Sequence, residues 1–156
     1  MKVYRFENRK SGKGMFTTCF KNTEHIKLNA LQEEIADELM AHFDKFPQDL
    51  PDPYNEYKKT FNINLSDYFD ECFEFLEFVQ SDSMFACPSI EKSSNWILNN
   101  EKLLDKMLKC GYFLYEIELD TNQKFYNLPS QVIFKKENII KRKVIHAKTI
   151  LKEFLR

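Results

Sequence analysis

Acidic side chains recur every three or four residues between Ser66 and Asp82, which is the spacing of one face of an α-helix. The carboxylates are Asp67, Asp70, Glu71, Glu74 and Glu77. Like charges at this spacing stand about 5–6 Å apart and destabilise a helix, so helix stability does not explain the pattern. A row of fixed negative charge imitates a nucleic-acid backbone and attracts a surface rich in Lys and Arg. The pattern predicts a binding surface for a basic partner, and the alternative is an ordinary solvated helix face.

Aromatic residues share this segment with the carboxylates. An apolar face is predicted from Phe69, Cys72, Phe73, Leu76 and Val79, and Tyr68, Phe75 and Phe78 lie beside it and widen it. The aromatic side chains either pack the helix against the core or anchor a second protein. The predicted partner-binding site therefore combines the five carboxylates with Tyr68, Phe75 and Phe78. Glu74 and Glu77 carry most weight, because the helix dipole disfavours negative charge toward the C-terminal half.

Charge is unevenly distributed along the 156 residues, although the net charge is only −1. Residues 24–82 carry fifteen acidic and four basic side chains, whereas residues 1–23 carry six basic and one acidic. Residues 83–156 carry thirteen basic and eight acidic side chains. The acidic middle pairs either with the basic ends, within one chain or across a dimer, or with an external partner. Complementary surfaces on one small chain also favour a homodimer, for which two-fold symmetry is the commonest closed form.

The order of predicted elements indicates a single α+β domain over residues 1–156. Strands are predicted at 3–7, 16–20, 84–87, 112–119 and 132–134, and helices at 29–46, 66–82, 88–98, 101–110 and the C-terminus. Residues 47–55 contain three prolines and predict a loop. We expect one small antiparallel sheet, with 132–134 pairing with 112–119, packed with three to five helices. An acidic helical insertion occupies about 60–82, and a basic C-terminal segment occupies about 135–156.

Composition and motifs exclude several classes of protein. No run approaches the roughly 20 apolar residues of a membrane span, and the N-terminus lacks the apolar core of a secretory signal, which favours a cytoplasmic location. The four cysteines are widely separated, without a Cys-x-x-Cys pair, which predicts neither disulfides nor a metal site. No phosphate loop or other cofactor motif is present, so no cofactor is expected.

An enzymatic alternative involves Glu116 and Glu118, which project from one face of the strand at 112–119. Together with Arg5 on an early strand, they are similar to the arrangement in ADP-ribosyltransferases, where a strand-borne Glu works beside an early Arg or His. Two Glu residues on an alternating strand are more often its solvated face. No nucleophile with an adjacent base can be named, so we expect a protein that is not an enzyme.

A second alternative is direct binding of nucleic acid through the basic C-terminal segment. Its cationic residues are Lys135, Lys136, Lys141, Arg142, Lys143, Lys148, Lys152 and Arg156. The balanced charge of the whole chain weakens this interpretation. If the acidic helix folded back on this segment, no free basic face would remain.

Several segments resemble a group of small proteins encoded by phages and integrated mobile elements. They are Tyr4–Glu7 with Gly12–Gly14, Pro51–Pro53, Met84–Phe85, Ser89–Ile97, Gly111–Ile117 and Gln131–Lys135. Proteins of this origin and size include inhibitors of bacterial defence, among them anti-CRISPR proteins. The resemblance implies an inhibitor of a CRISPR effector or another defence nuclease, with Cas9 as the most concrete target, that acts by protein–protein binding. The chain departs from that group in its acidic aromatic segment, where a specific function can be grafted onto a shared scaffold.

Overall fold

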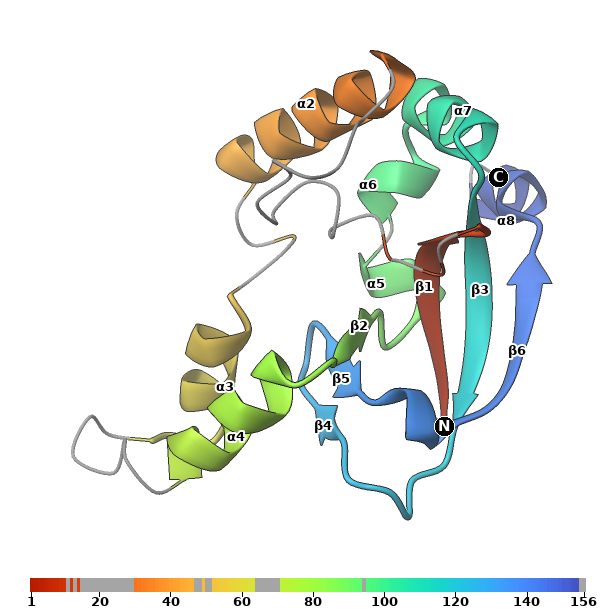
Figure 1. Ribbon diagram of the computed structural model, residues 1–156. Helices are drawn as coiled ribbons and strands as arrows, with labels where there is room; N and C mark the ends of the chain where they lie inside the picture. The colour runs from red at the N-terminus through yellow and green to blue at the C-terminus, as the bar shows by residue number, and fades with distance from the viewer. Residues whose placement is uncertain are drawn as a thin grey trace.

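The computed structural model describes residues 1–10, 12, 14, 30–46, 49, 52–63, 71–93 and 95–154 (Figure 1). These residues form two three-stranded antiparallel sheets, with strand orders β1-β3-β6 and β2-β5-β4. The described part of the chain also contains five helices of eight or more residues and two helices of four. The predicted α+β domain is confirmed, with two small sheets in place of the one that the sequence predicts.

The first sheet contains β1 (Lys2–Asn8), β3 (Tyr112–Leu119) and β6 (Ile139–Ile145). The central strand β3 pairs with both neighbours, so that Tyr4 and Lys143 lie on either side of Glu116. The strands β1 and β3 agree with prediction. The strand β6 was not predicted, because three consecutive charged residues at its centre hide the alternation of apolar and polar side chains that marks a strand.

The second sheet contains β2 (Met84–Ala86), β4 (Tyr126–Asn127) and β5 (Val132–Phe134). The predicted pairing of residues 132–134 with 112–119 is wrong, because β5 lies between β2 and β4, while both edges of β3 are occupied by β1 and β6. The two sheets are joined where Tyr4 and Cys87 exchange backbone hydrogen bonds, with N···O distances of 2.9 and 2.7 Å. A short 3₁₀ helix, η3 (Lys136–Asn138), leads from β5 into β6.

Helices cover one face of the first sheet, at the end of the sheet that is uppermost in Figure 1. They are α2 (Ala30–Lys45), α5 (Ile90–Ser93), α6 (Asn95–Leu98), α7 (Glu101–Lys109) and α8 (Ala147–Phe154). The predicted apolar face of α2 is confirmed, since Ile35, Leu39 and Phe43 are buried against Phe6 and Leu114 of the sheet in one cluster. Packing of this amphipathic face stabilises α2, because helices of this length are marginal on their own.

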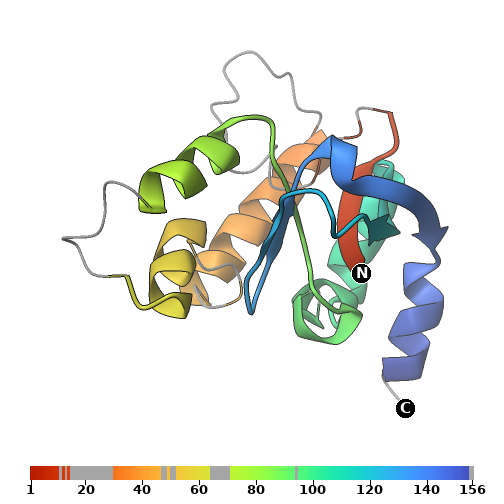
Figure 2. The same ribbon diagram turned by 90° about the horizontal axis from the view of Figure 1, so that it is seen from below.

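The opposite face of the first sheet packs against the second sheet. Val3 and Ile117 are fully buried there together with Val132 and Phe134. Figures 1 and 2 show the remaining helices, α3 (Pro53–Thr60) and α4 (Glu71–Gln80), side by side beyond the second sheet. The molecule therefore consists of a helix-covered sheet at one end and an α3–α4 pair at the other, with the second sheet between them.

The helix α3 replaces part of the loop that the sequence predicts at 47–55. Asp52 is its N-cap, and the carboxylate accepts hydrogen bonds from the backbone N–H groups of Tyr54 and Asn55 at 2.8 and 3.3 Å. Pro53 takes the first helical position, where a missing N–H costs nothing. The same proline that indicated a loop thus begins a helix.

An ion triad around the buried carboxylate of Glu7 links the two sheets. The carboxylate of Glu7, which has no exposed surface, accepts a hydrogen bond from Arg5 Nε at 2.9 Å and another from the Arg142 guanidinium. Arg5 also donates to the carbonyl oxygen of Phe85 at 2.7 Å. Burial, together with the neighbouring charge of Arg142, lowers the pKa of Arg5 to about 10. The triad connects β1 to β6 and to the second sheet.

A second cation, Lys135, fixes the C-terminal end of α4. Its ammonium donates to the carbonyl oxygen of Phe78 at 2.6 Å and to that of Ser81, and it lies 4.5 Å from the centroid of the Phe78 ring. These carbonyl groups have no partner within the helix, and a positive charge there opposes the negative end of the helix dipole. Lys135 therefore attaches α4 to the loop that follows β5.

Replacing Glu7 with Gln should lower the free energy of unfolding by about 3–5 kcal/mol, because two guanidinium groups lose the buried charge that compensates them. Chemical denaturation provides the measurement. The matched control is Glu118→Gln on β3, whose side chain is exposed and should change stability by less than about 0.5 kcal/mol. Equal effects of the two substitutions would contradict a stabilising role for the triad.

Replacing Lys135 with Met keeps the length of the side chain but removes its charge and its donors. We expect the C-terminal half of α4 to lose about 1 kcal/mol of local stability. Hydrogen exchange of peptides covering residues 71–83 measures this directly, and Lys136→Met, at the exposed neighbouring position, should leave their exchange unchanged. Identical exchange of α4 in Lys135→Met and the unaltered protein would show that this contact does not hold the helix.

Candidate functional site

The candidate site is the outward face of α4, here called the α4 stripe. It consists of Phe73, Glu74, Glu77 and Gln80, which follow one another at helical spacing and are all exposed. Phe73 is the least expected member, since 63% of its surface is open to solvent. An exposed phenyl ring beside two carboxylates gives this face both an apolar group and negative charge.

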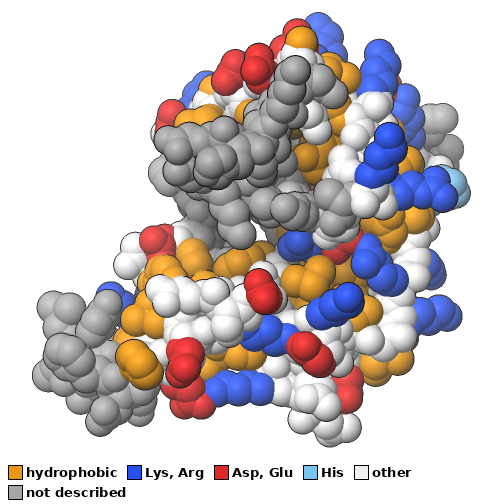
Figure 3. Space-filling model, viewed as in Figure 1, with side chains coloured by type: hydrophobic (Ala, Val, Ile, Leu, Met, Phe, Trp, Pro, Cys, Tyr) orange, Lys and Arg blue, Asp and Glu red, His pale blue; other side chains and the backbone are white. Residues whose placement is uncertain are grey.

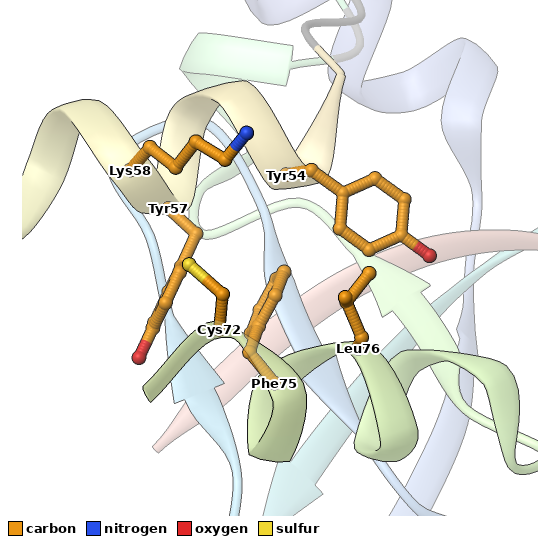
Figure 4. A pocket seen from close by; sticks show the side chains of 6 residues that line it. All are labelled: Tyr54, Tyr57, Lys58, Cys72, Phe75 and Leu76. Atoms are coloured by element: carbon orange, nitrogen blue, oxygen red, sulfur yellow. The ribbon is translucent and has the colours of Figure 1, made fainter. Parts of the chain in front are cut away.

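The inward face of α4 is held by aromatic packing. The rings of Phe75 and Tyr57 stack nearly parallel, with centroids 4.0 Å apart, and Tyr126 meets Phe75 edge-on at 4.9 Å. Figure 4 shows Tyr54 and Tyr57 of α3 facing Phe75 and Leu76 of α4, and the cavity between them has a volume of only about 10 Å³. Such close packing fixes the orientation of α4 and therefore of the α4 stripe.

Among the described residues, the two carboxylates of the α4 stripe have one ion pair between them, and it is exposed. Glu74 accepts a hydrogen bond from Lys124, which raises the pKa of the Lys124 ammonium, but both side chains are at least half exposed. Exposed pairs of this kind contribute at most about 1 kcal/mol and exchange readily for other partners. No ion pair involving Glu77 occurs among the described residues. The stripe is therefore open to an external cation.

The structure places the predicted site residues in different surroundings. Asp67, Tyr68 and Asp70 lie outside the described residues, as does the side chain of Glu71. Glu74 and Glu77 lie on the surface, as the predicted site requires.

Two of the predicted aromatic anchors pack against other side chains of the molecule. Phe75 is only 1% exposed and belongs to the core, so its role as an anchor for a partner is corrected. Phe78 is partly buried against Tyr126 and Lys135.

Phe73 is the surface aromatic residue that sequence reasoning assigned to the wrong face. Apolar residues occupy six of the ten positions in α4, so the boundary of its apolar face is poorly defined by sequence. The signal that could have identified it is the position of Phe73 four residues before Glu77 and next to Glu74, which places it on the acidic side of the helix.

The residues of the transferase alternative are not brought together. Glu116 lies 3.3 Å from the Lys2 ammonium and 3.4 Å from that of Lys143, in a hollow of about 70 Å³. Partial burial raises the pKa of Glu116, but the hydrogen bond from Lys2 and the charge of Lys143 outweigh it, so the pKa is lowered overall. By strand register Arg5 faces the other side of the sheet, where it contacts Glu7. This hollow therefore offers an ionised carboxylate already paired with lysines.

The predicted basic C-terminal segment is divided among several elements. Figure 3 shows Lys and Arg side chains along the edge formed by β6 and α8. Arg142 pairs with Glu7, Lys143 with Glu116, and Lys148 with Asp105 at 2.6 Å. Lys136 and Lys141 are exposed, whereas Arg156 and the side chain of Lys152 lie outside the described residues. Several of these cations thus neutralise acids of the same chain.

The described part of the chain contains neither a group of metal ligands nor a membrane-spanning helix. No three His, Cys, Asp or Glu side chains there are grouped as metal ligands would be. No helix in those ranges combines the length and the apolar character that crossing a bilayer requires. Cys72, Cys87 and Cys110 form no disulfide bond among the described residues.

Comparisons with curated proteins and with solved structures gave no match. A family model described as bacteriophage T4 Y00F protein matches residues 1–148, a range that includes α4 and both sheets. This supports the resemblance to small phage-encoded proteins that the sequence indicated. Because the match extends over nearly the whole chain, the protein belongs to the bacteriophage T4 Y00F protein family.

Proposed function

We propose that this phage-family protein acts by binding a protein of the bacterial host through the α4 stripe. The observation that carries the proposal is the exposed ring of Phe73 beside Glu74 and Glu77 on a rigidly packed helix. Buried aromatic anchors contribute most of the energy of protein interfaces, while surrounding charges set encounter rate and selectivity. The α4 stripe contains both kinds of group, and Phe73 takes the anchoring role that the sequence assigned to Phe75.

The chemistry of the α4 stripe favours a cationic partner. Its last turn contains no basic side chain, and Asp82 follows as a further exposed acid. Surfaces that bind nucleic acid present rows of Lys and Arg to phosphates, and carboxylates spaced along a helix offer those cations comparable ligands. The partner that fits is an enzyme that processes nucleic acid, and for a phage protein the concrete class is a defence nuclease such as Cas9. In this proposal the chain blocks the nuclease by occupying its basic surface.

The same proposal involves no chemical turnover. Arg5 is used in the buried triad, and Glu116 is paired with two lysines, so neither offers a free group for catalysis. The basic residues of β6 are largely paired with acids on β1 and β3, which supports a protein partner in preference to direct binding of nucleic acid through them. Cytoplasmic action follows from a target that works in the host cytoplasm.

Reversing the charge of the stripe with Glu74→Lys and Glu77→Lys should weaken inhibition at least about tenfold, because two attractive charges become repulsive. The assay is guide-directed DNA cleavage by Cas9 in the presence of increasing concentrations of the protein. Inhibition by the unaltered protein that persists undiminished in the double variant would rule out the α4 stripe, and absence of inhibition by the unaltered protein would rule out Cas9.

The matched control for this variant is Glu33→Lys with Asp37→Lys. These two exposed carboxylates lie one helical turn apart on α2, where no ion pair to either is seen within the described residues. The control changes net charge equally, so it should retain inhibition if the position of the charge matters. Circular dichroism should give the same spectrum for both variants and the unaltered protein.

The two phenylalanines of α4 should separate binding from folding. Phe73→Ala should leave the free energy of unfolding within about 0.5 kcal/mol and weaken partner binding about 30-fold, as expected for a central anchor. Phe75→Ala should lower the free energy of unfolding by about 3–5 kcal/mol, because it leaves a cavity in the aromatic core. Calorimetric binding to Cas9 and chemical denaturation measure the two effects. Unaltered affinity of Phe73→Ala would remove the aromatic anchor from the proposal.

A further inference from the structure

The outer edge of β6 is a second candidate binding surface, because its backbone groups pair with no other strand of the described residues. This strand ends the order β1-β3-β6, and no strand of the described residues pairs with its other side. Figure 1 shows it as the outermost strand of the first sheet. Alternate residues of an edge strand turn their backbone N–H and C=O groups outward, which makes the edge a template for an added strand.

The exposed side chains of β6 are apolar toward both ends of the strand and basic at its centre. Ile140 and Val144 are 62% and 44% exposed, although both are aliphatic. Lys141, Arg142 and Lys143 lie between them and are also exposed. Charged residues commonly protect an edge strand from pairing with other chains. Such protection explains the three cations but does not explain the exposure of Ile140 and Val144 on either side of them. The strand thus presents apolar, basic, apolar groups in sequence.

The acidic partners of these cations lie inward, on the sheet side of β6. Arg142 contacts Glu7 of β1, and Lys143 contacts Glu116 of β3. Lys141 forms no ion pair with any other described residue. Lys141 is therefore the cation most available to a ligand that approaches along the edge, and Arg142 and Lys143 offer it the 40% and 59% of their side chains that remain exposed.

A groove of about 680 Å³ continues from the end of β6. Its lining includes Phe113, Tyr115, Val144 and His146, with Arg9 and Lys148 as cations, and no acidic residue lines it. Its apolar part could receive a side chain that flanks an added strand, within the volume range of ordinary ligand pockets. The groove extends the basic and apolar character of the edge beyond the strand itself.

A second copy of this chain does not fit the edge. In antiparallel pairing of two β6 strands about their centre, Arg142 would face its own copy and Lys141 would face Lys143. Like charges directly opposite one another destabilise a sheet. A single strand of nucleic acid would satisfy the cations but would leave the outward backbone groups, Ile140 and Val144 without matching contacts.

We propose that β6 binds an extended acidic polypeptide segment that adds a fourth strand to the first sheet. Main-chain hydrogen bonds supply the pairing, acidic side chains meet the three central cations, and an apolar side chain on each flank covers Ile140 and Val144. This surface is separate from the α4 stripe, so an experiment can contradict one binding proposal without affecting the other.

The test uses a fluorescein-labelled peptide, Thr-Val-Glu-Glu-Glu-Val-Thr, whose symmetric sequence matches β6 in either strand direction. Titration followed by anisotropy gives its affinity, and ¹H–¹⁵N spectra locate it by shifts at residues 139–145. We expect binding at β6, and about three- to tenfold weaker binding by Lys141→Glu. The matched control Lys102→Glu alters an exposed lysine on α7 and should bind as the unaltered protein does.

Two further probes separate strand addition from simple charge attraction. The same peptide with N-methyl groups on alternate residues keeps its carboxylates but loses main-chain donors, and it should not bind at β6. A fluorescein-labelled thymidine decanucleotide should bind more weakly than the peptide. Equal binding of the N-methylated peptide, tighter binding of the oligonucleotide, or shifts confined to residues outside β6 would each overturn the proposal.

Discussion

The buried carboxylate of Glu7 between two guanidinium groups is the contact on which the arrangement of the sheets depends. Its three members come from β1 and β6, and Arg5 extends the contact to the carbonyl of Phe85 in the second sheet. The fully buried anion of Glu7 would be costly to leave without its guanidinium partners, so the triad favours one relative placement of the sheets. The second sheet in turn supports α3 and α4 through the cluster of Phe75, Leu128 and Ile133. The position of the α4 stripe is therefore set by contacts that begin on β1.

The separation of charge along the sequence persists in three dimensions. Basic residues of β6 pair with acids of β1 and β3, and Lys106 of α7 pairs with Glu34 and Glu38 of α2. Two described cations of residues 83–156 reach α4. Lys135 binds backbone carbonyls, and Lys124 forms an exposed ion pair with Glu74. The basic end of the chain thus stabilises the fold and leaves Glu77 without an ion pair among the described residues. This distribution gives the protein an acidic surface on α4 and a basic edge at β6.

Sequence periodicity predicted the elements in which apolar residues recur at one regular spacing. The apolar residues of α2 recur at helical spacing, and β3 alternates clearly, so both were identified with nearly correct ends. The strand β6 was not predicted because three consecutive charged residues hide its alternation, and α3 was not predicted because Pro53 is equally compatible with a loop and with the first position of a helix. The roles of Phe73 and Phe75 depend on contacts with α3 and β4, which are distant in sequence and leave no local signal. Glu7 likewise acquires its role only through Arg142, 135 residues away.

Hydrogen exchange of this protein in complex with the enzyme that it captures from a host lysate tests the central claim most directly. The account predicts that peptides covering residues 71–80 exchange more slowly in the complex than in the free protein, and that excess DNA or RNA substrate of that enzyme reverses the protection. Unchanged exchange of residues 71–80 in the complex would contradict a nucleic-acid-like acidic surface on α4. Protection of these residues that persists when the nucleic-acid substrate is bound would contradict it as well.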